Sequence, residues 1–100
     1  MKVRYTETAL SEIGEILSYV ARDNAVAAAE ITHAIDATVV LIADHPKIAR
    51  VVYADTVRAM PIARYPYRIF YEIDDGGIIL RNVRSMRRLR PWEENESSSM

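Results

Sequence analysis

The chain has 100 residues, of which 50% are hydrophobic and 27% are charged, and it contains no cysteine. This composition is typical of one small globular domain, and it excludes a disulfide framework and a thiolate metal site. We expect a single domain over residues 1–93 and a flexible polar tail over residues 94–100. The chain starts without a signal-peptide pattern, and its longest apolar run, 39–43, is far shorter than a membrane span. These features indicate a cytoplasmic protein.

The net charge of −1 hides an uneven distribution along the chain. Residues 1–46 include three basic and seven acidic side chains, whereas residues 47–90 include ten basic and four acidic side chains. Most of the basic residues are arginines, which make bidentate and stacked contacts better than lysines do. A domain with one basic half is expected to meet an acidic partner, either nucleic acid or an acidic protein segment.

The acidic half predicts a short strand followed by two helices. Residues 2–6 alternate as in a strand, and apolar residues then recur at helical spacing up to about residue 22. A second helix is expected over residues 25–44, and the short link between the two predicts an antiparallel helical hairpin. Glu12 and Glu15, one turn apart on the first helix, are interpreted as part of its solvated face.

The basic half predicts a loop and three strands. Residues 46–57 show little periodicity, and strands are expected over 58–64, 67–73 and 78–84, with a hairpin turn at 74–77. The register across this turn, and with it whether Ile79 or Leu80 faces the core, stays open. The order β-α-α-β-β-β predicts an α+β fold, in which an N-terminal helical hairpin packs on a small, mainly antiparallel sheet. The second face of that sheet is then at least partly available for binding.

Several side chains of the basic half have a specific expected role. The odd-numbered residues of the strand at 67–73 are expected to form its buried face. Arg68 and Glu72 lie on the other face and can form an ion pair, and Arg81 can pair with an acid of a neighbouring strand. The arginines gathered in residues 84–90 repel one another without a partner, which favours a binding role. Trp92 is expected to anchor the C-terminal segment on the domain.

The segment Arg64-Tyr-Pro-Tyr-Arg-Ile-Phe-Tyr-Glu-Ile73, with the order of elements, the loop at Pro46 and Arg58, resembles the ParE/RelE superfamily of bacterial toxins. The resemblance extends over about residues 3–92, and the Tyr-Pro-Tyr-Arg-Ile run is similar to the ParE-like branch. It implies the toxin of a type II toxin–antitoxin pair that inhibits DNA gyrase. It also implies a cognate ParD-like antitoxin, whose flexible C-terminal segment wraps the toxin.

Two other functions stay open. A RelE-like ribosome-dependent mRNA endoribonuclease would need basic residues and a C-terminal tyrosine, but no tyrosine follows Tyr71. Many ParE-like chains have a His-x-x-Arg pattern where this chain has Arg84-Ser-Met-Arg87, which keeps open a non-toxic, antitoxin-binding relic. His33 and His45 both precede the basic strands, so no acid–base pair is expected there, and we predict no catalytic residue, metal site or cofactor. Direct binding of nucleic acid is left open.

The candidate contacts fall into two sets. The target is expected to meet seven arginines of the basic half: Arg58, Arg64, Arg68, Arg81, Arg84, Arg87 and Arg88. The antitoxin is expected to meet the apolar stripe of the first helix and the C-terminal basic segment: Leu10, Ile13, Leu17, Arg84, Arg87, Arg90 and Trp92.

Overall fold

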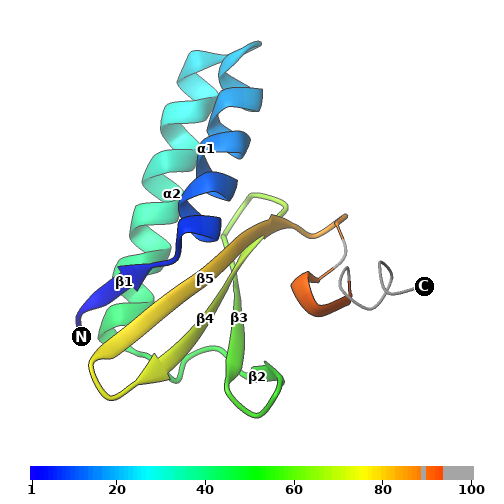
Figure 1. Cartoon of the computed structure of the whole chain (residues 1–100). Coiled ribbons are helices and arrows are strands. Elements are labelled where there is room, and N and C mark those ends of the chain that lie inside the picture. Colours follow the sequence, from blue (N-terminus) through cyan, green and yellow to red (C-terminus); the bar gives the residue numbers. More distant parts are fainter. Residues whose placement is uncertain (89, 94–100) are drawn as a thin grey trace.

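Two helices and five strands make up the part of the chain that the computed structural model describes, residues 1–88 and 90–93 (Figure 1). In chain order they are β1 (Val3–Tyr5), α1 (Glu7–Ala21), α2 (Ala25–Asp44), β2 (Val51–Tyr53), β3 (Val57–Pro61), β4 (Tyr67–Asp74) and β5 (Gly77–Ser85). The predicted tail at 94–100 lies outside the described residues, and the domain boundary at residue 93 stays a prediction.

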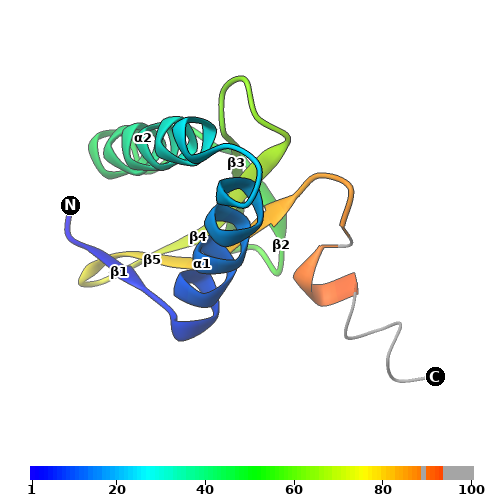
Figure 2. The ribbon, with the colours of Figure 1, turned by 90° about the horizontal axis from the view of Figure 1, so that it is seen from above.

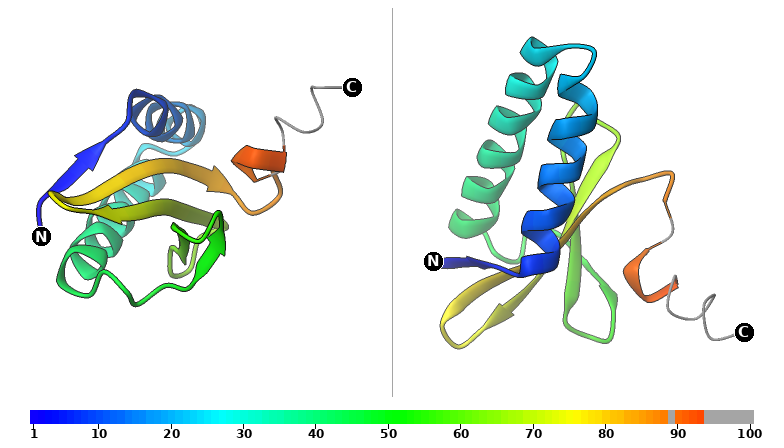
Figure 3. Two further views of the ribbon diagram at one scale, coloured as in Figure 1. Left: turned by 60° about the horizontal axis from the view of Figure 1, so that its bottom comes forward. Right: turned by 45° about the horizontal axis from the view of Figure 1, so that its top comes forward.

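The helices form the predicted antiparallel hairpin, in which α1 and α2 lie side by side (Figures 1 and 3). Each begins at a side chain that accepts a hydrogen bond from a free backbone N–H of the first turn. The Thr6 hydroxyl accepts from Ala9 N and the Asn24 amide oxygen from Ala27 N, both at 3.0 Å. α2 ends at Asp44, because the residue before Pro46 avoids helical geometry.

The five strands form one sheet in the order β1-β5-β4-β3-β2. β1 runs parallel to β5 and the other neighbours are antiparallel, so the mainly antiparallel α+β fold is confirmed. The prediction of a loop throughout 46–57 was wrong, because β2 pairs with β3 at the edge of the sheet. All three residues of β2 are exposed, so this strand lacks the alternation by which a sequence reveals a strand.

The β4–β5 hairpin has a two-residue turn, because Asp74 pairs directly with Gly77. This pairing settles the register: Leu80 is 1% exposed and packs in the core, while Ile79 is half-buried. Further along, Phe70 pairs with Asn82 but Tyr71 pairs with Leu80. Arg81 is therefore the extra residue of a β-bulge, which turns its side chain relative to a regular strand.

Gly77 allows the first strand to lie close to the last one. Its φ is +139°, and a Cβ built on it would lie 2.2 Å from the carbonyl oxygen of Lys2. The same oxygen accepts a hydrogen bond from Ile78 N at 2.8 Å. A side chain at position 77 would push β1 away from β5, so only glycine fits the parallel pairing.

The core lies between the helical hairpin and one face of the sheet. Ile31, Ile35 and Ile42 of α2 pack with Ile69 and Tyr71 of β4, which confirms the predicted buried face of that strand. α2 is long and apolar enough to cross a membrane by length and composition alone, a test that core helices of soluble proteins also pass. Seen from above, the helical turn at 91–93 lies across the strands from α2 (Figure 2).

Candidate partner-binding surface

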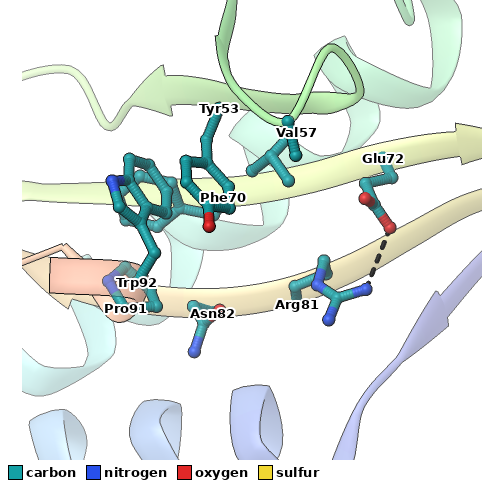
Figure 4. A pocket seen from close by; sticks show the side chains of 9 residues that line it. Tyr53, Val57, Phe70, Glu72, Arg81, Asn82, Pro91 and Trp92 are labelled. Carbon is teal, nitrogen blue, oxygen red and sulfur yellow. Dashed lines mark hydrogen bonds and ion pairs between the residues drawn. The ribbon is translucent and has the colours of Figure 1, made fainter. Parts of the chain in front are cut away.

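The sheet has a second face, which we call the open face, opposite the helices. Phe70 and Val57 are buried, 1% and 8% exposed, yet neither belongs to the core cluster under the helices. Strand alternation places Arg68 and Glu72 on the same face as Phe70. Polar and aromatic side chains therefore gather on the face that the helices leave uncovered (Figure 4).

Trp92 fastens the C-terminal turn to this open face. Its indole stacks on the ring of Tyr53, with centroids 4.3 Å apart and planes 8° from parallel. It also meets Phe70 edge-on, with centroids 5.6 Å apart. Offset-stacked and edge-to-face contacts are the favoured arrangements of aromatic rings. The expectation that Trp92 anchors the C-terminal segment on the domain is confirmed.

Glu72 and Arg81 form an ion pair between β4 and β5. Arg81 Nη1 lies 2.9 Å from Glu72 Oε2, which confirms the pairing of Arg81 with an acid of a neighbouring strand (Figure 4). The other carboxylate oxygen of Glu72 accepts a hydrogen bond from the Thr56 hydroxyl at 2.8 Å. No ion pair of Glu72 with Arg68 is found among the described residues.

A pocket of about 320 Å³ lies on the open face between the aromatic stack and the ion pair (Figure 4). One end is mainly apolar and the other is polar. The lining residues are Tyr53, Ala54, Val57, Phe70, Glu72, Arg81, Asn82, Pro91 and Trp92.

Arg68 lies beside this pocket, and its guanidinium group contacts an aromatic ring while one of its donors is buried. Its guanidinium carbon is 5.5 Å from the centroid of the Phe70 ring, within cation–π range. Its Nε is buried and has no hydrogen-bond partner within the described part of the chain. Buried donors are rarely left without an acceptor, because the lost hydration is not replaced. Arg68 also faces Arg84 directly across β4 and β5.

Arg84 is buried, 9% exposed, and forms an ion pair with Glu12 of α1. The distance from Arg84 Nε to Glu12 Oε2 is 2.6 Å. The other oxygen of Glu12 accepts from Val83 N and from the Asn82 amide, both at 3.1 Å. β1 pairs with β5 only as far as Leu80, so the carboxylate takes the place of a neighbouring strand beyond that point. The interpretation of Glu12 as a solvated residue was wrong, whereas Glu15 is exposed.

Arg58 lies on the helix-covered face, apart from the open face. Its Nη1 donates to the carbonyl of Ala49 at 2.6 Å. It pairs across the strands with Tyr71, whose hydroxyl donates to the carbonyl of Pro46 at 2.7 Å. Burial raises the pKa of Tyr71 above its usual value of 10.0, and the nearby Arg58 charge partly opposes this. Arg58 thus holds the loop after α2 against the sheet.

The other candidate arginines lie near two ends of the sheet. Arg64 is exposed in the β3–β4 loop with a left-handed φ of 76°, near Glu30 and His33 of α2. Arg87 and Arg88 are exposed just beyond β5. The seven arginines therefore do not form one surface: Arg68 and Arg81 are on the open face, and Arg58 is on the other face.

The candidate antitoxin contacts are divided in the same way. Leu10 is 56% exposed, whereas Ile13 and Leu17 are partly buried and pack against the core. Arg90 lies over Trp92, with 5.9 Å from its guanidinium carbon to the ring centroid, and pairs with Glu93 at 3.2 Å. Leu10 is thus the most accessible of the three apolar candidates on α1.

The described residues contain no group of three or more His, Cys, Asp or Glu side chains placed to hold a metal ion. His33 lies exposed on α2 and His45 follows its last residue, so neither is on a strand of the open face. Around the pocket the open face thus presents arginines, aromatic rings and the engaged carboxylate of Glu72. Such a set can bind an anionic or amphipathic partner by charge and stacking.

Two solved structures of known proteins are similar to this fold. In structure the chain is similar to a chain of the chromosomal ParDE TA system from P. aeruginosa, with a TM-score of 0.74 and 15% identity over 85% of this chain and 95% of that one. It is also similar to the isolated E. coli RelE toxin, with a TM-score of 0.58 and 14% identity over 98% and 97% of the two chains. No curated protein sequence matches it.

These likenesses, at such low identity, show a shared fold. The family is shown by the sequence itself, because residues 3–90 match the model of the ParE toxin of the type II toxin–antitoxin system parDE. This match extends over both helices and all five strands. The chain belongs to the ParE toxin family of type II toxin–antitoxin systems.

Proposed function

We propose that this toxin acts in the cytoplasm as a non-enzymatic inhibitor of DNA gyrase and is neutralised by a cognate ParD-like antitoxin. The observation that carries the proposal is the chemistry of the open face. Arg68, Arg81 and the aromatic stack can grip a partner, but the carboxylate that lines the pocket beside them, that of Glu72, is already engaged by Arg81 and Thr56. Phosphodiester cleavage by 2′-hydroxyl attack works best with a general base and a general acid, and a binding toxin needs neither.

The antitoxin is proposed to bind at α1 and at the arginines after β5, which it would share with the target. Leu10 is exposed on α1, and Arg87 lies exposed where β5 ends. A pocket of about 390 Å³ between α1 and this segment is lined by Glu12, Arg84 and Arg88 among others. An antitoxin segment with apolar side chains for α1 and carboxylates for the arginines would match this region and would screen the repulsion among them.

A ribosome-dependent endoribonuclease is the second candidate. It is favoured by the likeness of the fold to the E. coli RelE toxin and by the arginines around the open face. In that case the arginines would hold the scissile phosphate. A non-toxic, antitoxin-binding relic is the third candidate, because Arg84 replaces the expected histidine and is tied to Glu12.

Two reactions run side by side separate these candidates. The purified chain is added to gyrase in a supercoiling and DNA-cleavage reaction, and to a coupled translation reaction in which mRNA cleavage is mapped. We expect lost supercoiling with accumulated cleaved DNA, and intact mRNA. Cut mRNA with unaffected gyrase would establish the nuclease instead, and no effect in either reaction would support the relic.

A charge variant tests the role of the arginines in the same reactions. Replacing Arg87 and Arg88 together by glutamine should weaken gyrase inhibition, and its salt dependence should fall as well. Arg22→Gln is the control, because Arg22 is an exposed arginine at the C-terminal end of α1. If both variants inhibit gyrase equally well, Arg87 and Arg88 do not take part in target binding.

A further inference from the structure

We infer that the pocket on the open face is a preformed receptor for one large apolar side chain of a protein partner, next to a carboxylate of the same partner. The inference deepens the proposed function, since it supplies the way in which a target protein would be held. It rests on that function only in the identity of the partner. The pocket has a strained wall, room for one large side chain and a cation beside it.

The wall of the pocket that β2 contributes is held in a strained conformation. Ala54 and Asp55 form the turn between β2 and β3, and both have left-handed backbones, with φ of 53° and 61°. Alanine has no side-chain hydrogen bond to support such a backbone, and glycine or asparagine is the usual choice. Strain of this kind persists where neighbouring contacts hold it in place, and it gathers at functional sites.

The turn is held by its own backbone hydrogen bond and by contacts with side chains of the open face. Thr56 N donates to the carbonyl of Tyr53 at 3.2 Å, and the Thr56 hydroxyl donates to Glu72 at 2.8 Å. On the other side of the turn, Tyr53 is stacked on Trp92. The turn, the C-terminal segment and the two central strands are thus joined around the pocket. A cavity whose walls are fixed before binding costs its ligand less ordering entropy.

The shape of the pocket suits a single large side chain. Val57 and Phe70 form a buried apolar floor, and Trp92 rises at the side (Figure 4). A volume of about 320 Å³ is at the lower limit for ligand pockets, enough for one aromatic or long aliphatic group. A pocket with an apolar floor and a polar end can receive an anchor residue of a protein interface.

The charges favour a protein over a nucleic acid as the occupant. Inside the pocket the Arg81 charge is balanced by Glu72, and at the rim the Arg90 charge is balanced by Glu93. A phosphate backbone would meet two carboxylates there. Arg68 is a further cation beside the pocket, and its Nε lacks an acceptor among the described residues. One carboxylate next to the anchor side chain would pair with the Arg68 guanidinium and balance its charge.

Trp92 makes the inference directly measurable, because it is the only tryptophan in the chain and it lines the pocket. The probe is a blocked hexapeptide, Gly-Ser-Phe-Asp-Ser-Gly, titrated into the full chain while the indole fluorescence and the indole N–H resonance are followed. We expect a saturable response with a Kd on the order of 1 mM, in the range of weak peptide contacts. The same peptide with alanine for phenylalanine should bind at least about tenfold more weakly.

Two variants test the predicted rim. Arg68→Gln should raise the Kd of the peptide about fivefold. In this variant, replacing the aspartate of the peptide by asparagine should no longer change the Kd. Arg4→Gln is the control, because Arg4 is an exposed arginine far from the pocket, paired with Asp74 at the other end of the sheet. Binding by the control variant should equal that of the unaltered chain.

Other outcomes would overturn the inference. A decathymidine oligonucleotide that moves the indole signal more strongly than the peptide would make the occupant a nucleic acid. Equal responses to the phenylalanine and alanine peptides, or no response to either, would show that the pocket does not bind a large apolar side chain. If the chain binds the peptide but does not inhibit gyrase, only the gyrase proposal is refuted. If the chain inhibits gyrase but does not bind the peptide, only the inference about the pocket is refuted.

Discussion

The carboxylate of Glu12 on α1 lies 2.6 Å from the guanidinium Nε of Arg84 on β5, and this buried ion pair joins the helical layer to the sheet where β1 has ended. Glu12→Gln should lower the free energy of unfolding by about 3 kcal/mol, because it leaves a buried arginine without its counter-charge. Urea denaturation followed by far-ultraviolet circular dichroism measures the change.

The control for this prediction is Glu15→Gln, which changes the same residue type one turn further along α1 at an exposed position. It should change the free energy of unfolding by no more than about 0.5 kcal/mol. If the two variants were equally stable, the Glu12–Arg84 pair would have no structural role.

The stack of Tyr53 on Trp92 should be visible in a double-mutant cycle. Each single change to alanine removes the stack, which has a centroid distance of 4.3 Å, and the coupling free energy is expected to be about 1 kcal/mol. The free energy of unfolding is measured for the two single variants, the double variant and the unaltered chain. Strictly additive effects would mean that the two rings contribute independently of each other.

Relieving the strained turn should stabilise the protein. Ala54→Gly is expected to raise the free energy of unfolding by up to about 1 kcal/mol, because glycine accepts the φ of 53° without a steric cost. Ala63→Gly, in a loop where no positive φ occurs at that residue, should instead destabilise slightly through the entropy of the unfolded chain. A loss of stability in both variants would show that the turn is not strained.

The stability of the fold should decline in alkaline solution through Tyr71. Its pKa is raised in the folded state, so its stabilising contribution is complete below about pH 10 and is lost as the pH rises further. Tyr71→Phe should flatten part of this decline and lower stability near pH 7 by about 1 kcal/mol, since the carbonyl of Pro46 loses its donor. Tyr5, whose pKa burial also raises, should account for part of the remaining decline. An unchanged alkaline profile in Tyr71→Phe would refute the role of this hydroxyl.

The sequence predicts those elements whose residues repeat with a clear period. Both helices and the strands from 67–73 and 78–84 follow from such periods, and α2 matches its predicted bounds of 25–44. β2 could not be predicted, because its three residues are exposed and are a strand only through pairing with β3. The register of β5 depends on the turn and on the bulge at Arg81, neither of which has a unique sequence pattern.

The candidate surface was harder to predict than the fold. Counting arginines groups Arg58 with Arg68, but strand alternation puts them on opposite faces of the sheet. Glu12 has the sequence spacing of a surface residue. It is buried because β1 ends beside it, and its carboxylate covers the edge of β5 that β1 leaves unpaired. The pocket escaped prediction because its wall, β2, was not recognised. The turn at Ala54 and Asp55 leaves no signal in the sequence, since these residues are not the usual ones for it.

The parallel pairing of β1 with β5 sets the order in which the toxin can become complete during synthesis. The contact of Thr6 with Arg81 spans 75 residues, whereas the helical hairpin uses only neighbouring segments. Helices form from local contacts, and distant strands pair late. A nascent chain would therefore have its hairpin before the sheet that covers the hairpin's apolar side. The pocket and the arginines at 84–90 would be assembled only after β5 and Trp92 have left the ribosome, later than the helical hairpin.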